Sequence, residues 1–335
     1  MEELLKVDNL SVVYHSNNGD VQAVRQISFN VKPGRTIAIV GESGCGKSAT
    51  AKALMKLNDN GHGEIKEHSK IIYKGKDILK YSDEEMATYR GGEVAIIFQD
   101  ALTALNPTMR IGKQIAENII LHKKDISKKQ AMQEAVKLLE YVGIPDPVKR
   151  ARQYPHEFSG GMRQRVMIAI AIACRPNILI ADEPTTALDV TIQAQIIKLL
   201  KELQNSLNMS IILITHDLGV VADIAHDIAV MYGGEIVEMG TCDEIFYEPR
   251  HPYTKALLNS VTRIDEKKKR LVTIEGMPPN LIDDIKGCAF YDRCTYSMER
   301  CRNFKPQKTI VSDTHNFACF RDMNTDKEEE GLDGR

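Results

Sequence analysis

Residues 41–48 read GESGCGKS, which combines three glycines with a lysine and a serine. The spacing fits G-x-x-x-x-G-K-[ST], with the apolar run TIAIV before it and the helix-forming SATAKALMKL after it. Glycines at these positions let successive backbone N–H groups turn toward phosphates, and the following helix adds the positive end of its dipole. We therefore predict a nucleotide-binding phosphate loop formed by Gly41, Ser43, Gly44, Cys45, Gly46, Lys47, Ser48 and Ala49.

Three side chains of this loop have separate expected roles. Lys47 supplies positive charge to the β- and γ-phosphates, and Ser48 supplies a hydroxyl ligand to Mg²⁺. Cys45 is open to two interpretations. It is either a thiol whose oxidation controls nucleotide binding, or a position that tolerates substitution because the backbone makes the phosphate contacts.

An acidic motif, ILIADEP, follows at 178–184. Its apolar residues indicate a buried strand that ends at Asp182, where a carboxylate can hold Mg²⁺ directly or through water. Glu183 points elsewhere because strand side chains alternate, which suits a carboxylate that orients or activates the attacking water.

Four further motifs lie in order along the chain, IIFQD at 96–100, FSGGMRQR at 158–165, ALD at 187–189 and ITHD at 214–217. Together with the phosphate loop and the acidic strand, they resemble the ATP-binding subunits of ABC transporters. The family's signature LSGGQ is matched by FSGGM, so Met162 stands where the family usually has Gln. We expect this departure to affect only a peripheral contact, because Ser159 and the two glycines remain.

The resemblance assigns further site residues. Gln99 would bind Mg²⁺, Tyr14 would stack on adenine, and His216 would contact the γ-phosphate and hold the attacking water with Glu183. The resemblance also implies that two ATPase domains pair head to tail, with each ATP between one chain's phosphate loop and the other chain's signature helix. The residues that would reach that second ATP are Ser159, Gly160, Gly161 and Met162, followed by the D-loop residue Asp189.

Longer segments are similar to the ATPase subunits of bacterial oligopeptide and dipeptide importers, namely QDALTALNP, DEPTTALDVTIQAQI, HPYTKALL and GCAFYDRC. That similarity implies a paralogous second ATPase as heterodimer partner, two membrane permease subunits and an external solute-binding protein. It places the chain at the cytoplasmic face of the membrane as a peripheral subunit. An importer of nickel or another small solute remains an alternative, as do a soluble ABC ATPase and a regulatory or assembly ATPase.

Four of the seven cysteines gather toward the end of the chain, at Cys288, Cys294, Cys301 and Cys319. Zinc sites usually separate paired cysteines by about two to four residues, and this C-x5-C-x6-C-x17-C spacing is a poor match. Four thiolates can also hold an iron–sulfur cluster. The peptide-importer ATPases carry similar extensions with a proposed [4Fe–4S] cluster, so we expect that cluster, with zinc or free thiols as alternatives.

The elements that position these residues are of the α/β class. Alternating polar and β-branched residues at 4–14 and 21–31 predict strands, as do 64–80 and the apolar runs 36–41, 178–182, 210–215 and 228–240. Helices are expected at 48–57, 83–90, 113–142, 161–174, 191–207, 217–226 and 243–263, the last one broken at its prolines. Strands that alternate with helices predict a mostly parallel core sheet. The resemblance adds an N-terminal antiparallel β subdomain and a helical signature subdomain.

The amino-acid composition and the lengths of the apolar runs exclude some classes of protein. Lys and Arg total 44 and Asp and Glu total 46, so a generally basic nucleic-acid binder is excluded and no nucleic-acid partner is expected. We see no signal peptide, and the longest apolar run, 166–174, is far shorter than the roughly 20 residues of a membrane span. We predict an ATPase domain at 1–263 with its helical subdomain at about 100–165, a four-cysteine extension at 264–322, and a disordered acidic tail at 323–335.

Overall fold

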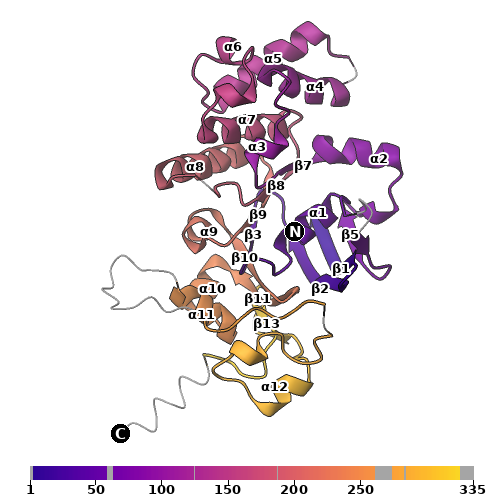
Figure 1. Ribbon diagram of the computed structural model, residues 1–335, viewed down its shortest axis with the longest axis vertical. Helices are drawn as coiled ribbons and strands as arrows, with labels where there is room; N and C mark the ends of the chain where they lie inside the picture. The colour runs from indigo at the N-terminus through magenta and orange to yellow at the C-terminus, as the bar shows by residue number, and fades with distance from the viewer. Residues whose placement is uncertain are drawn as a thin grey trace. The chain divides into compact units, whose positions relative to one another are not determined.

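The computed structural model describes residues 3–58, 63–123, 125–186, 188–260, 274–282 and 284–324. The chain divides into two compact units. Figure 1 labels the helices and strands named below. The first unit comprises Met1–Leu4, Val31–Thr36 and Asp77–Ile214, and the second comprises Leu5–Asn30, Ile37–Lys76 and Thr215–Arg335. The predicted domain boundary at 263/264 lies outside the described residues and stays a prediction.

The N-terminal part of the second unit is a β-sheet with the strand order β2 (Gly19–Val31), β1 (Leu5–Ser16), β5 (Lys70–Tyr73) and β6 (Lys76–Asp77). A short strand, β4 (Gly63–Ile65), also pairs with β1. Strand β1 runs antiparallel to β4 and β5, as expected for the N-terminal subdomain. The prediction of strands at 64–80 holds to residue 77, where the 3₁₀ helix η1 (Ile78–Lys80) begins.

A second sheet in this unit contains β3 (Thr36–Val40) and β10 (Asp227–Tyr232), which are parallel. Strand β11 (Glu235–Thr241) is antiparallel to β10 and to β13 (Asn316–Phe317), which pairs with β12 (Thr309–Ile310). The single strand predicted at 228–240 is therefore wrong. Gly233 and Gly234 take positive φ angles of 55° and 82° and turn the chain into a hairpin.

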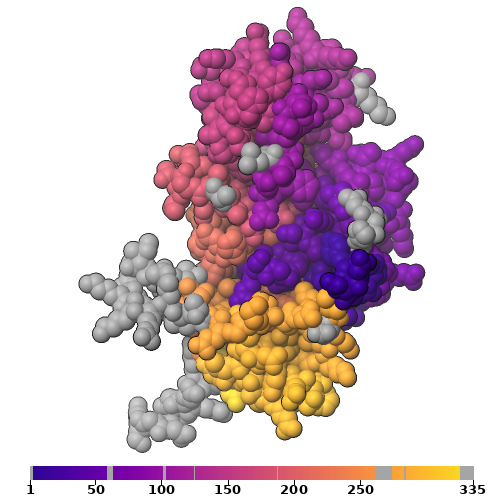
Figure 2. Space-filling view, viewed as in Figure 1, coloured from indigo at the N-terminus to yellow at the C-terminus, as the bar shows by residue number. Residues whose placement is uncertain are grey.

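The helices of the second unit are short. They are α1 (Lys47–Leu54), α9 (Leu218–Ile224), α10 (Cys242–Tyr247), α11 (Pro252–Ser260) and α12 (Glu299–Asn303), with the 3₁₀ helix η4 at Tyr291–Arg293. The predicted break of the 243–263 helix at its prolines is confirmed up to residue 260. Figure 2 shows the C-terminal residues gathered as one contiguous body in yellow. We call residues 287–324 the C-terminal module.

In the first unit, β7 (Val94–Ile97), β8 (Ile178–Asp182) and β9 (Ser210–Thr215) form a parallel arrangement with β8 in the middle. All residues of β8 and β9 are buried, as is typical of strands covered on both faces. The surrounding elements are α2 (Asp83–Thr88), the π-helical turn η2 (Tyr89–Glu93), α3 (Ala101–Ala104), α4 (Ile111–His122), α5 (Lys128–Tyr141), α6 (Pro147–Arg150), η3 (Pro155–Glu157), α7 (Gly160–Ile172) and α8 (Val190–Leu207).

The continuous helix predicted at 113–142 is wrong, because the structure has α4 and α5 in its place. Ser127 begins α5 with a capping box. Its hydroxyl accepts from the Gln130 amide at 3.3 Å, and the Gln130 side chain accepts from the Ser127 amide at 3.0 Å. This reciprocal pair satisfies helix-start donors, so a new helix begins at that point.

Two further expectations concern the membrane and the tail. Among the residues that the structure describes, no helix is long and apolar enough to cross a bilayer. The acidic tail was predicted from residue 323, but Met323 is 2% exposed and its amide donates to the Arg250 carbonyl at 3.1 Å. The chain is therefore ordered past that point, and residues 325–335 lie outside the described part.

Candidate active site

The phosphate loop connects β3 to α1 in the second unit, as the sequence predicts. Gly41 has φ 157°, and a Cβ there would lie 2.1 Å from the Met231 carbonyl oxygen. Gly46 has φ 107°, and its Cβ would lie 2.2 Å from the Ala23 carbonyl oxygen. Only glycine fits such close backbone approaches. Strand β10 and strand β2 therefore fix the curvature of the loop at its two ends.

Lys47 is the first residue of α1, and its side chain is buried at 5% exposure. Its ammonium group donates to the carbonyls of Gly41 and Glu42, both at 2.8 Å. The charge is thus held over the loop's own backbone. This position suits a cation that would bind β- and γ-phosphates in the loop, so the predicted role of Lys47 is geometrically reasonable.

Cys45 is buried within the loop, with 5% of the residue exposed. Burial raises the pKa of its thiol, and the Lys47 charge only partly opposes that effect. A protonated, enclosed thiol reacts slowly with oxidants. Of the two interpretations, the geometry favours the second, in which the Cys45 side chain only fills space and its backbone makes the contacts. Its carbonyl accepts a hydrogen bond from Gly234 at 3.1 Å.

Tyr14, the predicted adenine-stacking residue, lies on β1 opposite Gly63 of β4. A Cβ at Gly63 would come within 2.9 Å of the Tyr14 ring, so the glycine leaves room for it. The Tyr14 hydroxyl accepts a 2.9 Å hydrogen bond from Asn58, whose amide also donates to the Ala49 carbonyl of α1 at 3.4 Å. Asn58 thereby ties the ring to the helix that follows the phosphate loop. Asn58 is buried and belongs to none of the sequence motifs.

In the first unit, Gln99 and Glu183 meet at the ends of two neighbouring strands. Ile97 of β7 pairs with Ala181 of β8, so residues two positions further along both strands are in register. The Gln99 amide donates to Oε2 of Glu183 at 2.9 Å, and the Thr186 hydroxyl donates to the same oxygen at 2.8 Å. Thr186 is a second contact that the motif did not predict.

The backbone at Glu183 is in the left-handed region, with φ 47°. Its amide is held by the Ile214 carbonyl of β9 at 2.8 Å. An L-residue in this region is strained by about 1–3 kcal/mol, and such strain persists where the surroundings enforce it, often at functional sites. Asp182 directly before it is 5% exposed at the end of β8. Glu183 is partly exposed, so the two acids differ in burial.

The signature segment begins α7. Ser159 is the N-cap residue, and its hydroxyl accepts from the Met162 amide at 3.4 Å. Gly161 packs tightly on α8, because a Cβ there would lie 2.7 Å from the Ile192 side chain. The helix begins with two glycines whose first-turn N–H groups form a potential anion site. The trans contact to ATP that the resemblance implies stays a prediction.

Asp189 caps α8, accepting a 2.9 Å hydrogen bond from the Ile192 amide. Because Ile192 also contacts Gly161, the D-loop and the signature segment are adjacent. Ala187, the first residue of the D-loop match, lies outside the described residues.

His216, in the second unit, is exposed directly after β9. Asp217, next to it, caps α9 by accepting hydrogen bonds from the amides of Gly219 and Val220. The predicted site residues thus form two groups, one in each unit.

The four C-terminal cysteines lie in one neighbourhood within the C-terminal module. Gly287 packs so closely that a Cβ would lie 2.3 Å from the Cys301 carbonyl oxygen, and the Cys288 amide donates to that oxygen at 2.8 Å. Burial raises the pKa of Cys288 to about 12, and the charges of Cys319, Cys294 and Cys301 add to that effect. All four are free thiols.

Backbone amides point at three of these sulfurs. Each donor lies two residues after its cysteine, in the pairs Cys288–Phe290, Cys294–Tyr296 and Cys319–Arg321. Such N–H···S hydrogen bonds stabilise thiolate ligands. Among the described residues, however, no three His, Cys, Asp or Glu side chains are arranged to hold a single metal ion.

The strand–loop–helix that carries the phosphate loop, the acidic strand end and the glycine-capped signature helix together define an ABC-type ATPase. The chain matches the ABC transporter family over residues 24–186 and the C-terminal region of oligopeptide/dipeptide transporters over residues 237–301. It belongs to the family of ATP-binding subunits of dipeptide and oligopeptide ABC transporters.

Individual relatives agree with this assignment. The chain is 52% identical to the dipeptide transport ATP-binding protein DppD of Bacillus subtilis, over 96% of this chain and 95% of the relative. It is 54% identical to the oligopeptide transport ATP-binding protein OppD of the same organism, over 93% and 87%. A dimeric ATP-binding cassette solved with ADP and Pi has a TM-score of 0.63 and 25% identity, over 71% of this chain and 98% of that one. The predicted α/β ABC-type fold is therefore confirmed.

Proposed function

We propose that this chain hydrolyses ATP to drive the uptake of dipeptides or oligopeptides through a membrane ABC importer. The observation that carries the proposal is the match along nearly the whole chain, at 52% identity, to a subunit named for dipeptide transport. Two local contacts support the proposal, namely the Lys47 ammonium bound to the phosphate-loop backbone and the Gln99 amide bound to the Glu183 carboxylate. The nickel alternative has no comparable support among the relatives described above.

The test is uptake of a labelled dipeptide by cells that lack the natural chain. We expect the natural sequence to restore uptake and Lys47→Ala to abolish it, because the loop loses its cation. Lys52→Ala is the matched control, since Lys52 is an exposed residue of the same helix, α1. Restoration of nickel uptake without peptide uptake would overturn the substrate assignment.

For the reaction, we propose that Lys47 and the loop amides bind the ATP phosphates, while Ser48, Gln99 and Asp182 hold Mg²⁺. Glu183 would orient the attacking water with His216. A carboxylate held by two neighbouring donors, as Glu183 is by Gln99 and Thr186, is fixed in direction and can act as a general base. Tyr14 would stack on the adenine.

A second ATPase chain is part of this proposal. The ATP on one phosphate loop would contact the signature residues of a paralogous partner, in a head-to-tail heterodimer at the cytoplasmic face of the membrane. The first-turn amides of α7 and the Ser159 hydroxyl are suitable donors for its γ-phosphate. Recovery of the chain with a second ATPase and two permeases would support this assembly, while recovery with ribosomes or DNA would contradict it.

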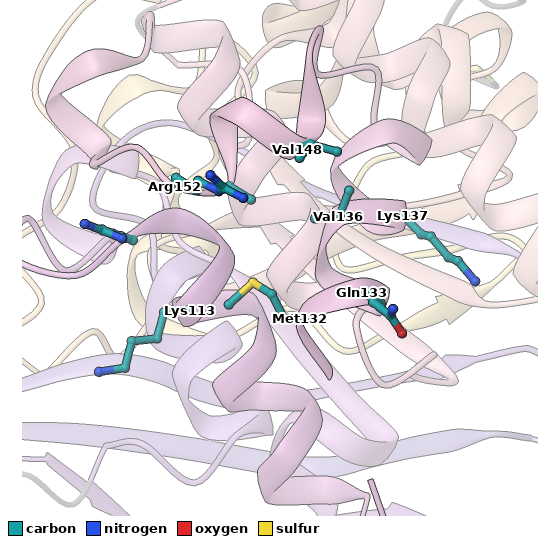
Figure 3. Close-up of a pocket in the computed structure, with 9 residues that line it drawn as sticks. Lys113, Met132, Gln133, Val136, Lys137, Val148 and Arg152 are labelled. Carbon is teal, nitrogen blue, oxygen red and sulfur yellow. The ribbon is translucent and has the colours of Figure 1, made fainter. Parts of the chain in front are cut away.

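We propose that a groove in the first unit receives a cytoplasmic helical segment of a permease (Figure 3). The groove has a volume of about 790 Å³ and lies among α4, α5 and α6. Met132 lies between Lys113 and Lys137, whose side chains extend to opposite sides (Figure 3). An apolar floor with basic edges fits an amphipathic helix that carries acidic groups. The lining residues are Arg110, Lys113, Met132, Gln133, Val136, Lys137, Val148, Ala151 and Arg152.

We also propose that the four C-terminal cysteines hold a [4Fe–4S] cluster. Four free thiols in one neighbourhood, with amides directed at three sulfurs, fit the donor set of such a cluster. A cluster spreads its ligands wider than one metal ion does, so the lack of a single-ion arrangement in the described residues does not conflict with it. When bound, it would serve as a structural staple for the C-terminal module.

The cluster is tested on anaerobically purified full-length protein. We expect about four iron and four sulfide per chain, as the cluster's composition requires. Cys301→Ser should lose both, whereas Cys242→Ser, outside the C-terminal module, should retain both. Zinc in place of iron, or metal-free protein, would overturn the assignment.

A further inference from the structure

Glu42, the second residue of the phosphate loop, is bound by an arginine from the C-terminal module, 251 residues away. Nη1 of Arg293 donates to Oε2 of Glu42 at 2.5 Å, and Nη2 donates to Oε1 at 2.9 Å. Two parallel bonds from one guanidinium fix both the distance and the orientation of a carboxylate. The Arg293 side chain is 5% exposed and that of Glu42 is 25% exposed, so solvent screens this pair less than a surface ion pair.

Arg293 is itself held in place on the other side. Its Nε donates to the Glu275 carbonyl at 3.0 Å, and Nη2 donates to the Ile274 carbonyl at 3.1 Å. Nη1 also donates to the Tyr232 hydroxyl at 3.2 Å. With its position fixed by these acceptors, the guanidinium is a rigid support, and the loop residue is the part that it restrains.

The backbone of Glu42 is held as well. Its amide donates to the Tyr253 hydroxyl at 3.0 Å, and its carbonyl accepts from Lys47 at 2.8 Å. Tyr253 is fully buried, and its ring centre lies 4.5 Å from that of Tyr232 and 5.3 Å from that of Phe290. The aromatic cluster Tyr232–Tyr253–Phe290 thus includes one residue of the C-terminal module and fixes the hydroxyl that reaches the loop.

We propose that Arg293 and Tyr253 are positioning residues of the ATP site, through which the C-terminal module sets the affinity of the chain for ATP. A loop that is already held in one conformation loses less freedom when ATP binds. Arg293 also pairs with a carboxylate that would otherwise repel a triphosphate nearby. Both effects favour ATP binding. The inference rests on the proposed ATPase function, and it gives the C-terminal module a task at the nucleotide site.

The test is equilibrium binding of a fluorescent ATP analogue to the full-length chain. We expect Arg293→Gln to raise the ATP dissociation constant on the order of tenfold. Arg302→Gln, at an exposed arginine of the same module, is the matched control and should leave the constant unchanged. Arg293→Lys should restore part of the affinity, because it keeps the charge but not the fork. Tyr253→Phe should weaken binding by a few fold through loss of one hydrogen-bond partner.

A double-mutant cycle separates positioning from general damage to the fold. In a Glu42→Gln background, Arg293→Gln should change the ATP dissociation constant by less than about twofold, because its partner is already gone. An equal loss in both backgrounds would overturn the proposal, as would an unchanged constant for Arg293→Gln alone. The natural chain must bind ATP in the same assay, so failure of the ATPase assignment is distinguished from failure of the Arg293 proposal.

Discussion

The side-chain amide of Gln99 and the carboxylate of Glu183 are joined by a 2.9 Å hydrogen bond between residues that follow neighbouring parallel strands. The register of β7 and β8 places both residues at the same level, two positions beyond the pair Ile97–Ala181. A displacement of Gln99 would therefore break or reorient its hydrogen bond to the Glu183 carboxylate. This contact offers a physical connection between the segment that follows β7 and the carboxylate for which we propose the water-activating role.

Glu183→Gln is expected to bind ATP but to hydrolyse it at least about 100-fold more slowly, because the amide is not a base. The measurement is phosphate release by the assembled transporter, with ATP binding determined in parallel. Thr186→Val removes one hydrogen bond to Oε2 of Glu183 and should lower the rate of ATP hydrolysis only a few fold. If Glu183→Gln kept more than a tenth of the natural turnover, another group would be activating the water.

Cys45 is expected to resist alkylation in the native protein. Burial raises the pKa of its thiol, so little reactive thiolate is present at neutral pH, and the enclosed position limits access. Iodoacetamide at pH 7.5, followed by mass spectrometry, should modify Cys45 at least about tenfold more slowly than in the urea-unfolded chain. Cys45→Ala should retain ATP binding. Rapid native alkylation that blocks ATP binding would instead establish an oxidisable switch.

The sequence predicted the buried strands well because their signals are local. The runs at 178–182 and 210–215 are continuous apolar stretches, and the structure has β8 and β9 at these positions. The errors arose where a short signal interrupts a long pattern. Gly233–Gly234 splits one predicted strand into a hairpin, and the capping box at Ser127 splits one predicted helix into two. Two or three residues decide each of these breaks.

The residues of the candidate site also fall into two groups, those with a local sequence signal and those without one. Residues with motif chemistry, such as Lys47 and Glu183, could be predicted from local spacing. Asn58 and Arg293 could not, because their partners Tyr14 and Glu42 are 44 and 251 residues away and neither pair leaves a periodic pattern. Contacts of this kind depend on how the strands and the C-terminal module pack.

The stability of the second unit is expected to fall as the pH drops below about 6.5. His251 is buried, and burial lowers its pKa from 6.5 to about 4, although the nearby Glu238 charge opposes this effect. The unfolded chain therefore binds a proton at a higher pH than the folded chain does. The stabilisation is fully present above pH 6.5 and is lost progressively toward pH 4, by at most about 3 kcal/mol.

The pH dependence is checked with urea unfolding at pH 7.0 and pH 5.0. His251→Asn should reduce the difference between the two unfolding free energies, because it removes the titrating group. Its side-chain oxygen can still accept from the Tyr253 amide, which donates to Nδ1 at 3.0 Å in the natural chain. His156→Gln, at an exposed histidine, should leave the difference unchanged. An unaltered pH dependence in His251→Asn would show that other groups cause it.

The groove among α4, α5 and α6 gives the last prediction. Met132 and Val148 line the groove and are 37% and 61% exposed. A chain with an acidic residue at either position should therefore still fold, while the new charge disfavours contact with an apolar partner surface. Met132→Glu and Val148→Glu should each reduce recovery of the chain with its permeases by at least about tenfold, as expected at the centre of an interface.

Leu121→Glu is the matched control, because Leu121 is 74% exposed on α4 outside the lining residues. ATP binding by the isolated chain should be unchanged in all three variants, since the phosphate loop belongs to the other unit. Equal recovery of all three would place the permease contact elsewhere on the first unit.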